Sequence, residues 1–83
     1  MDYYIYILEC ADQTLYCGYT IDLEKRVFNH NNSDVGAKYT KARRPVRLVY
    51  FEKVSSLSEA LKREHQIKKL TKKQKQMLIN GSM

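Results

Sequence analysis

Several features that define large classes of proteins are missing from this chain. It opens with Met1 and the acidic Asp2, and no apolar segment of the kind found in signal peptides follows. The longest apolar run, residues 3–8, is far too short to span a bilayer. Two cysteines, Cys10 and Cys17, are too few for a disulfide scaffold or a structural zinc site. We therefore expect a cytoplasmic protein with two buried, unbridged thiols.

Short motifs of several enzyme classes are also absent. The sequence contains no Walker loop, dinucleotide-binding fingerprint, serine elbow or cysteine metal knuckle, so no organic cofactor is expected. It contains no internal repeat and no low-complexity segment. Its 83 residues, 43% of them apolar, are enough for one small globular domain with a thin core. We expect that domain to cover residues 1–80 and a frayed tail to cover residues 81–83.

Basic residues are abundant and clustered. The net charge is +6, and residues 38–47 hold five of the 15 basic side chains while residues 62–75 hold seven. Such clustering favours a polyanionic partner, usually nucleic acid, although it is also compatible with a merely solvated basic face. An anionic membrane is disfavoured because the basic segments lack an opposing Trp/Phe-rich face.

No feature of the sequence is suited to recognising base edges, so binding to the phosphate backbone should be salt-sensitive and largely independent of sequence. Tyr39 either stacks on a nucleobase or braces its own loop. The residues expected to contact nucleic acid are Lys38, Tyr39, Lys41, Arg43, Arg44, Lys68, Lys69, Lys72 and Lys73.

The first part of the chain predicts a β-hairpin. Residues 3–9 and 14–19 are rich in strand-forming side chains, and the short polar segment 11–13 separates them. If the loop has those three residues, Tyr6 and Tyr16 share one face of the hairpin as diagonal neighbours, about 7–8 Å apart. A loop with an even number of residues would place them on opposite faces.

A helix is expected to begin after the N-cap Asp22 and to end within residues 31–34. On it, Arg26 and His30 are four residues apart and so lie on one face, beside apolar contacts. A basic loop, residues 36–45, should follow.

The remainder of the chain predicts a strand over residues 46–51 and two further helices. Ser56 and Thr71 begin capping boxes for helices over residues 57–70 and 72–79. The order β-β-α-β-α-α predicts an α+β fold, with a small, mostly antiparallel sheet of three strands flanked by helices.

Polar side chains in apolar surroundings indicate a site. Five of the seven tyrosines lie at or before Tyr19, and a buried phenol needs a hydrogen-bond partner. Glu64 falls on the apolar stripe formed by Leu57, Ala60, Leu61 and Ile67, where a carboxylate must be paired, protonated or bound to a metal. Either Glu64 is a ligand of Mg²⁺, which commonly takes one or two carboxylates, or the helix is rotated and Glu64 pairs with Lys68 at the surface.

Together these groups suit the hydrolysis of a phosphodiester. A metal and Arg26 would stabilise charge on the phosphate oxygens, and a base would take a proton from water. A tyrosine acting as base at pH 7 carries a penalty of roughly 4 kcal/mol because its pKa is about 10. His30, with an ordinary pKa near 6.5, is the base that these considerations favour, although a phenol remains an alternative.

The chain resembles the GIY-YIG nuclease domain, and especially the short stand-alone bacterial proteins of that type, over about residues 3–79. The two family triplets correspond to Tyr4-Ile5-Tyr6 and Tyr16-Cys17-Gly18. The pattern Gly-x4-Leu-x2-Arg-x3-His corresponds to residues 18–30, and the late metal-binding glutamate corresponds to Glu64.

The resemblance implies Mg²⁺- or Mn²⁺-dependent cleavage of DNA, one strand at a time. In that scheme Tyr6 activates the water, Tyr16 positions it, and Arg26 holds the scissile phosphate. His30 assists proton transfer and Glu64 holds the metal.

The chain departs from the family pattern in four ways. Tyr4 replaces the first glycine of the family and Cys17 replaces an isoleucine, while a late asparagine has only Asn80 as a counterpart. The separate DNA-binding domain of larger members is absent, so weakly sequence-selective or structure-selective cleavage is expected. The alternatives are a non-catalytic nucleic-acid-binding module and a protein-interaction scaffold.

Overall fold

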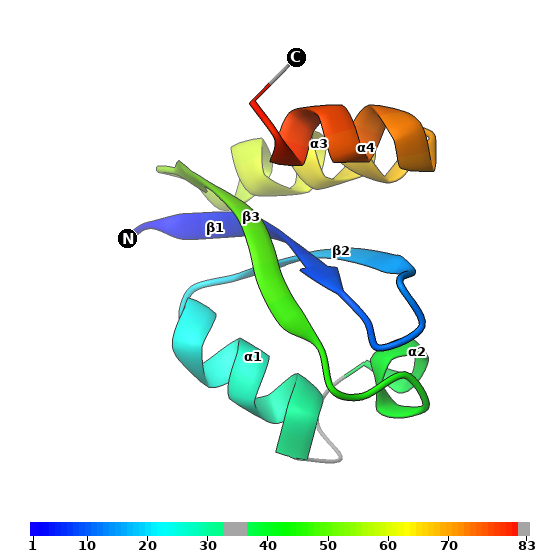
Figure 1. Cartoon of the computed structure of the whole chain (residues 1–83). Coiled ribbons are helices and arrows are strands. Elements are labelled where there is room, and N and C mark those ends of the chain that lie inside the picture. The colour runs from blue at the N-terminus through cyan, green and yellow to red at the C-terminus, as the bar shows by residue number, and fades with distance from the viewer. Residues whose placement is uncertain (33–36, 82–83) are drawn as a thin grey trace.

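A three-stranded antiparallel sheet forms the centre of the molecule (Figure 1). The computed structural model describes residues 1–32 and 37–81. Strands β1 (Tyr3–Glu9), β2 (Leu15–Thr20) and β3 (Arg47–Val54) are arranged in the order β2-β1-β3. Since β1 is central, β2 is an edge strand of the sheet.

The hairpin has the predicted three-residue loop. Leu8 pairs with Tyr16 and Tyr6 pairs with Gly18, while the Cys10 amide donates to the Thr14 carbonyl at 2.9 Å. Tyr6 and Tyr16 consequently share one face of the sheet, as the odd-numbered loop requires.

Helices cover both faces of the sheet. On one side lie α1 (Leu23–Asn32) and the short α2 (Lys38–Lys41), and on the other lie α3 (Leu57–Lys68) and α4 (Lys72–Ile79) (Figure 1). Three predicted N-caps are confirmed, since the side chains of Asp22, Ser56 and Thr71 each accept a backbone N–H from the first turn of a helix. The α+β fold is therefore confirmed.

Three predicted boundaries were wrong. Residues 37–45 are not all loop, because α2 forms there around the buried Thr40, whose hydroxyl bonds the Ala37 carbonyl at 2.9 Å. Strand β3 continues to Val54, since it pairs with β1 as far as Tyr3. Helix α3 ends at Lys68, because Thr71 is extended and begins the next helix. Residue 36 and the predicted helix end at residues 33–34 lie outside the described residues.

The core consists of two thin layers, one on each face of β1. Tyr6, Leu8, Cys10 and Val46 form the layer under α1. Ile5, Ile7, Cys17, Ala60 and Ile67 form the layer under α3. The two cysteines are buried, unbridged and on opposite faces, as predicted. No helix in the described part of the chain is long and apolar enough to cross a membrane.

Candidate active site

A buried hydrogen-bond cluster joins β1 to α1. The Tyr6 hydroxyl lies 2.9 Å from His30 Nε2, and Arg26 Nε donates to the same hydroxyl at 3.3 Å. Tyr6 is 1% exposed and His30 is fully buried. The helical spacing of Arg26 and His30 thus places both side chains on one phenol of the facing sheet.

Tyr16 packs beside this cluster. Its ring centroid is 6.5 Å from that of Tyr6 and 5.3 Å from that of His30. On the other side of the site its ring stacks on Tyr39 at 5.9 Å, and the Arg43 guanidinium lies 3.9 Å from the Tyr39 ring centre. Tyr39 therefore makes the contacts expected of a residue that braces its loop.

Gly18 is required by the position of the Tyr6 phenol. A Cβ at residue 18 would lie 2.5 Å from the Tyr6 oxygen and 2.7 Å from its Cζ. The register that pairs these two residues leaves no room for a larger side chain. The last residue of the second triplet thus admits the tyrosine of the first, a steric role that the sequence reasoning missed.

Three contacts fix the end of α1 that carries His30. Thr40 Oγ1 lies 2.7 Å from His30 Nδ1, and Arg44 Nε donates to the His30 carbonyl. The Asn31 amide exchanges two hydrogen bonds with the Val46 backbone, at 2.7 and 2.9 Å. The sequence reasoning also missed Thr40; the only signal for it is a lone threonine three residues after Ala37 in a basic segment.

Burial changes the proton affinity of both central groups. It raises the pKa of Tyr6 to about 12, although the hydrogen bond from Arg26 opposes the rise. Burial, with the positive charges of Arg26 and Arg44, lowers the pKa of His30 to about 4. The preference for His30 as base rested on an ordinary pKa, and in the fold His30 is a much weaker base. Ionising Tyr6 at pH 7 requires about 7 kcal/mol, more than the sequence indicated.

The buried His30 should make the protein less stable in mild acid. The unfolded chain binds a proton at His30 near pH 6.5, whereas the folded chain does so only near pH 4. The stabilisation is therefore full above pH 6.5 and is lost as the pH falls towards 4. We expect the free energy of unfolding, measured with urea, to fall by about 2 kcal/mol between pH 7.5 and pH 5. His30→Gln should flatten this dependence and the exposed control His65→Gln should preserve it; the reverse pattern would contradict the assignment.

Glu64 lies on the other side of the sheet from the phenol cluster. Glu64 belongs to α3, which packs on the face of the sheet that carries Cys17. Burial, together with the negative charge of Glu64, raises the pKa of the Cys17 thiol to about 11. The Glu64 side chain is 15% exposed and its Oε1 lies 3.5 Å from Lys68 Nζ. In the part of the chain that the structure describes, no hydrogen bond or ion pair joins Glu64 to Tyr6 or Arg26.

The predicted apolar stripe of α3 is narrower than expected. Ala60 and Ile67 are buried, but Leu57 is 43% exposed and Leu61 is 44% exposed. Helix α3 is therefore rotated about its axis relative to the predicted orientation. Glu64 consequently lies at the rim of the interface between α3 and the sheet, where it forms the ion pair with Lys68.

The surroundings of Glu64 are compatible with a weakly held divalent cation. Among residues 1–32 and 37–81 there is no group of three His, Cys, Asp or Glu side chains that could enclose a metal. One carboxylate is nevertheless sufficient for Mg²⁺ when water and substrate oxygens complete its coordination. The residues therefore fit a metal that is held partly by the substrate.

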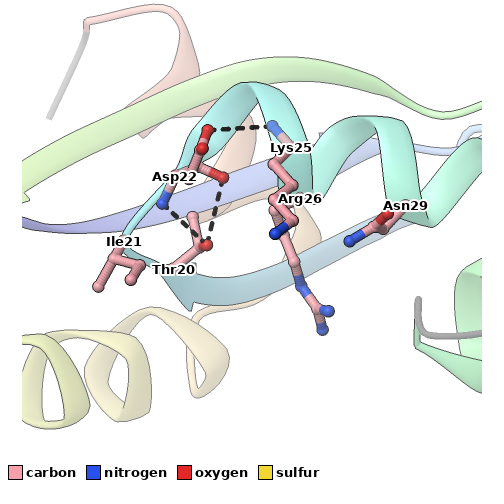
Figure 2. Close-up of a pocket in the computed structure, with 6 residues that line it drawn as sticks. All are labelled: Thr20, Ile21, Asp22, Lys25, Arg26 and Asn29. Atoms are coloured by element: carbon pink, nitrogen blue, oxygen red, sulfur yellow. Dashed lines mark hydrogen bonds between the residues drawn. The ribbon is translucent and has the colours of Figure 1, made fainter.

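Arg26 also lines a pocket of about 280 Å³ beside the N-terminal half of α1 (Figure 2). The remaining lining residues are Thr20, Ile21, Asp22, Lys25 and Asn29. In Figure 2 the Arg26 side chain extends away from α1, and Thr20 and Asp22 are joined by hydrogen bonds at the turn between β2 and α1.

The basic residues fall into two groups. Arg43 is committed to the fold through Asp12, 3.2 Å away, and through Tyr39, while Arg44 holds the end of α1. The lysines of the set are all exposed: Lys38, Lys41, Lys68, Lys69, Lys72 and Lys73. Asn80 is exposed at the C-cap of α4.

Comparisons with known proteins find a family model and similar proteins that match most of this chain. A family model described as the GIY-YIG catalytic domain matches residues 2–77. A UPF0213 protein of Syntrophus aciditrophicus is 59% identical over 76 residues, which are 92% of this chain and 87% of the relative. UPF0213 protein SSP2268 of Staphylococcus saprophyticus is 55% identical over 94% of each chain.

Two solution NMR structures are similar to this chain. UPF0213 protein BH0048 from Bacillus halodurans is 42% identical with a TM-score of 0.62, over 96% of this chain and 84% of that one. Protein EF2693 from E. faecalis is 44% identical with a TM-score of 0.66, over 98% and 85% of the two chains.

Proposed function

This chain belongs to the GIY-YIG catalytic domain family, and from that premise we propose that it is a metal-dependent endonuclease that hydrolyses phosphodiester bonds of DNA. The observation that carries the proposal is the buried cluster in which Arg26 and His30 both contact the Tyr6 hydroxyl. A fold that needed only a packed core would have no use for a phenol, an imidazole and a guanidinium at one point.

Each member of the cluster has a separate role in this proposal. Tyr6 removes a proton from the attacking water as its own phenol proton passes to His30 Nε2, 2.9 Å away. Because burial lowers the pKa of His30 to about 4, this transfer depends on positive charge that stabilises the phenolate. Arg26 binds the scissile phosphate in the pocket that it lines, where a guanidinium matches two phosphate oxygens. Tyr16, packed on both Tyr6 and His30, limits where the water can lie.

The raised pKa of Tyr6 supports a role for cations in the proposed mechanism. With a pKa of about 12 the phenol keeps its proton at neutral pH, and the neighbouring Arg26 only partly offsets the effect of burial. A divalent cation, Mg²⁺ or Mn²⁺, bound at Glu64 would supply the further positive charge. The protein itself provides the dry, fixed environment in which that charge acts strongly.

An edge strand allows groups on opposite faces of the sheet to reach one phosphate. Arg26 packs on one face of the sheet and Glu64 on the other, with β2 between them as the outermost strand. Gly18 of β2 presents no side chain beside the Tyr6 phenol. We infer that the scissile phosphate lies along the outer edge of β2, where both side chains converge on it.

The exposed lysines suit the flanking phosphates. Those at the α3–α4 junction follow Glu64 along the chain, and Lys38 and Lys41 follow α1. None of these side chains is suited to distinguishing one base from another, so we propose weak sequence selectivity or a preference for branched or nicked structures.

The proposal is tested by incubating the protein with nicked, branched and single-stranded DNA, and with RNA, with Mg²⁺ or with chelator. We expect cleavage of DNA that the chelator abolishes, and a loss of about 10²-fold or more in Glu64→Gln because the metal loses its protein ligand. Glu59→Gln, an exposed carboxylate on the same helix, is the matched control and should cleave normally. A Glu64→Gln variant as active as the parent would refute the assignment of the metal ligand.

The second candidate is a non-catalytic nucleic-acid-binding module. The Glu64–Lys68 ion pair favours it, because a paired carboxylate needs no metal. It predicts that Tyr6→Phe binds DNA normally, and that replacing Lys68, Lys69, Lys72 and Lys73 weakens binding and its salt dependence. Chelator-sensitive cleavage that copurifies with the wild-type chain and is lost in Glu64→Gln excludes it.

A further inference from the structure

Thr40 is a fully buried residue of α2 that contacts the Nδ1 edge of the His30 ring. Its Oγ1 lies 2.7 Å from His30 Nδ1 and 2.9 Å from the Ala37 carbonyl oxygen. It lies on the opposite side of the imidazole from Tyr6, which contacts Nε2. Thr40 therefore touches none of the groups expected to meet a substrate, and it contacts the buried ring that is hydrogen-bonded to the Tyr6 hydroxyl.

The single proton of the Thr40 hydroxyl determines the direction of the hydrogen bonds. A carbonyl oxygen can only accept, so the contact with Ala37 is made by donation from Thr40. Because the hydroxyl hydrogen is used in the bond to the Ala37 carbonyl, the hydroxyl oxygen must accept a hydrogen bond from His30. This requires the ring proton on Nδ1. Nε2 then carries a lone pair, and the Tyr6 hydroxyl donates to it.

The opposite arrangement satisfies the cluster less well. The Ala37 amide lies 3.4 Å from Nδ1 and would donate to it if the ring proton were on Nε2. The Tyr6 oxygen would then accept from both Arg26 and His30, and no contact of the described residues would take the phenol's own proton. An unsatisfied hydroxyl on a phenol that is 1% exposed is strongly destabilising. An unsatisfied amide at Ala37 is less costly because that residue is only half-buried.

We propose that Thr40 is a positioning residue that holds neutral His30 in the Nδ1–H form, with the Nε2 lone pair directed at the Tyr6 hydroxyl. On ionisation of Tyr6 the phenol O–H bond breaks and a new N–H bond forms at Nε2. The product is an imidazolium whose Nδ1–H remains bonded to Thr40. The catalytic meaning of this arrangement rests on the proposed nuclease function, but the tautomer itself does not.

Nitrogen NMR of the 83-residue chain tests the proposal without any measurement of activity. In ¹⁵N-labelled protein at pH 7, long-range proton–nitrogen correlations from the His30 ring should show a protonated Nδ1 and an unprotonated Nε2. Thr40→Ser keeps the hydroxyl and should keep this pattern, whereas Thr40→Val removes the acceptor and should shift the population towards Nε2–H. A wild-type spectrum with the proton on Nε2 overturns the proposal, even if no Thr40 variant folds. An unchanged Nδ1–H form in Thr40→Val also overturns it.

Kinetics separates this proposal from the nuclease function. If the chain cleaves DNA, Thr40→Val should lower kcat by about 10–10²-fold with little change in KM, and Thr40→Ser should restore it. A chain that cleaves no DNA but shows Nδ1–H in His30 refutes the nuclease and supports the positioning role. An active chain with Nε2–H refutes the positioning role alone.

Discussion

Replacing Tyr6 with phenylalanine should lower the rate of DNA cleavage by about 10²–10⁴-fold, the range typical for loss of a proton-transferring group. The substitution removes one oxygen and leaves the ring in place. It leaves Arg26 Nε and His30 Nε2 without the hydroxyl that bonds both, at 3.3 and 2.9 Å. Single-turnover cleavage of a nicked duplex, with DNA affinity measured separately in chelator, would assign the loss to the chemical step.

Tyr3→Phe is the matched control for this experiment. Tyr3 lies on the same strand but packs against the core on the opposite face of the sheet, so its hydroxyl is remote from the cluster. The Tyr6 variant should also be less stable by about 1–3 kcal/mol, because a buried polar partner is left unsatisfied. Equal cleavage rates in the two variants would remove Tyr6 from the mechanism.

Gly18→Ala should lower both stability and activity. The added methyl carbon would lie 2.5 Å from the Tyr6 oxygen. The phenol has little freedom to move away because its hydroxyl is hydrogen-bonded to His30 and Arg26. Either the β1–β2 pair separates or Tyr6 leaves its site, and overpacking of this kind costs about 1–3 kcal/mol. Chemical denaturation measures the first effect, and cleavage should fall at least as far as in Tyr6→Phe.

A double-mutant cycle identifies the cause of that loss. In a Tyr6→Leu background the two closest contacts of the new methyl group, with the Tyr6 oxygen and Cζ, are absent, and the looser contact with Tyr16 Cε2 at 3.3 Å remains. Gly18→Ala should then destabilise the chain much less than it does in the wild type, which corresponds to a coupling energy of about 0.5–3 kcal/mol between residues 6 and 18. The same loss in both backgrounds would show that the phenol is not what excludes a side chain at residue 18.

Local sequence signals were enough to predict the fold. Strand propensity, the parity of a three-residue loop, and N-caps at Asp22, Ser56 and Thr71 act over a few residues, and each was confirmed. The errors arose where tertiary contacts decide. Strand β3 extends to Val54 because β1 offers it partners, and α2 forms because Thr40 is buried against His30.

The sequence predicted the partners in the cluster but not their energetics. Spacing placed Tyr6, Tyr16, Arg26 and His30 together, and the structure brings these four side chains into contact. It could not predict how far the pKa of His30 would fall, because that depends on how deeply the fold buries the ring and on the nearby charges of Arg26 and Arg44.

The register that the three-residue loop predicts already sets Gly18 opposite Tyr6, but it does not show how close the phenol lies to residue 18, so the steric role of Gly18 was missed. The position of Glu64 depends on how α3 is rotated about its axis. The predicted apolar stripe includes Leu57 and Leu61, which are exposed in the structure, so the periodicity gave the wrong rotation. Helical spacing alone is too coarse to fix a side chain at a rim.

The central claim is that Arg26 and Glu64, on opposite faces of the sheet, serve one site at the outer edge of β2. A titration of the ¹⁵N-labelled chain with substoichiometric Mn²⁺ tests it most directly, because the paramagnetic ion broadens nuclear signals near where it binds. We predict that the signals of Glu64, Gly18 and Arg26 lose intensity together, and that Glu64→Gln abolishes the effect at all three. Broadening confined to α3, with Gly18 and Arg26 unchanged, would contradict the claim.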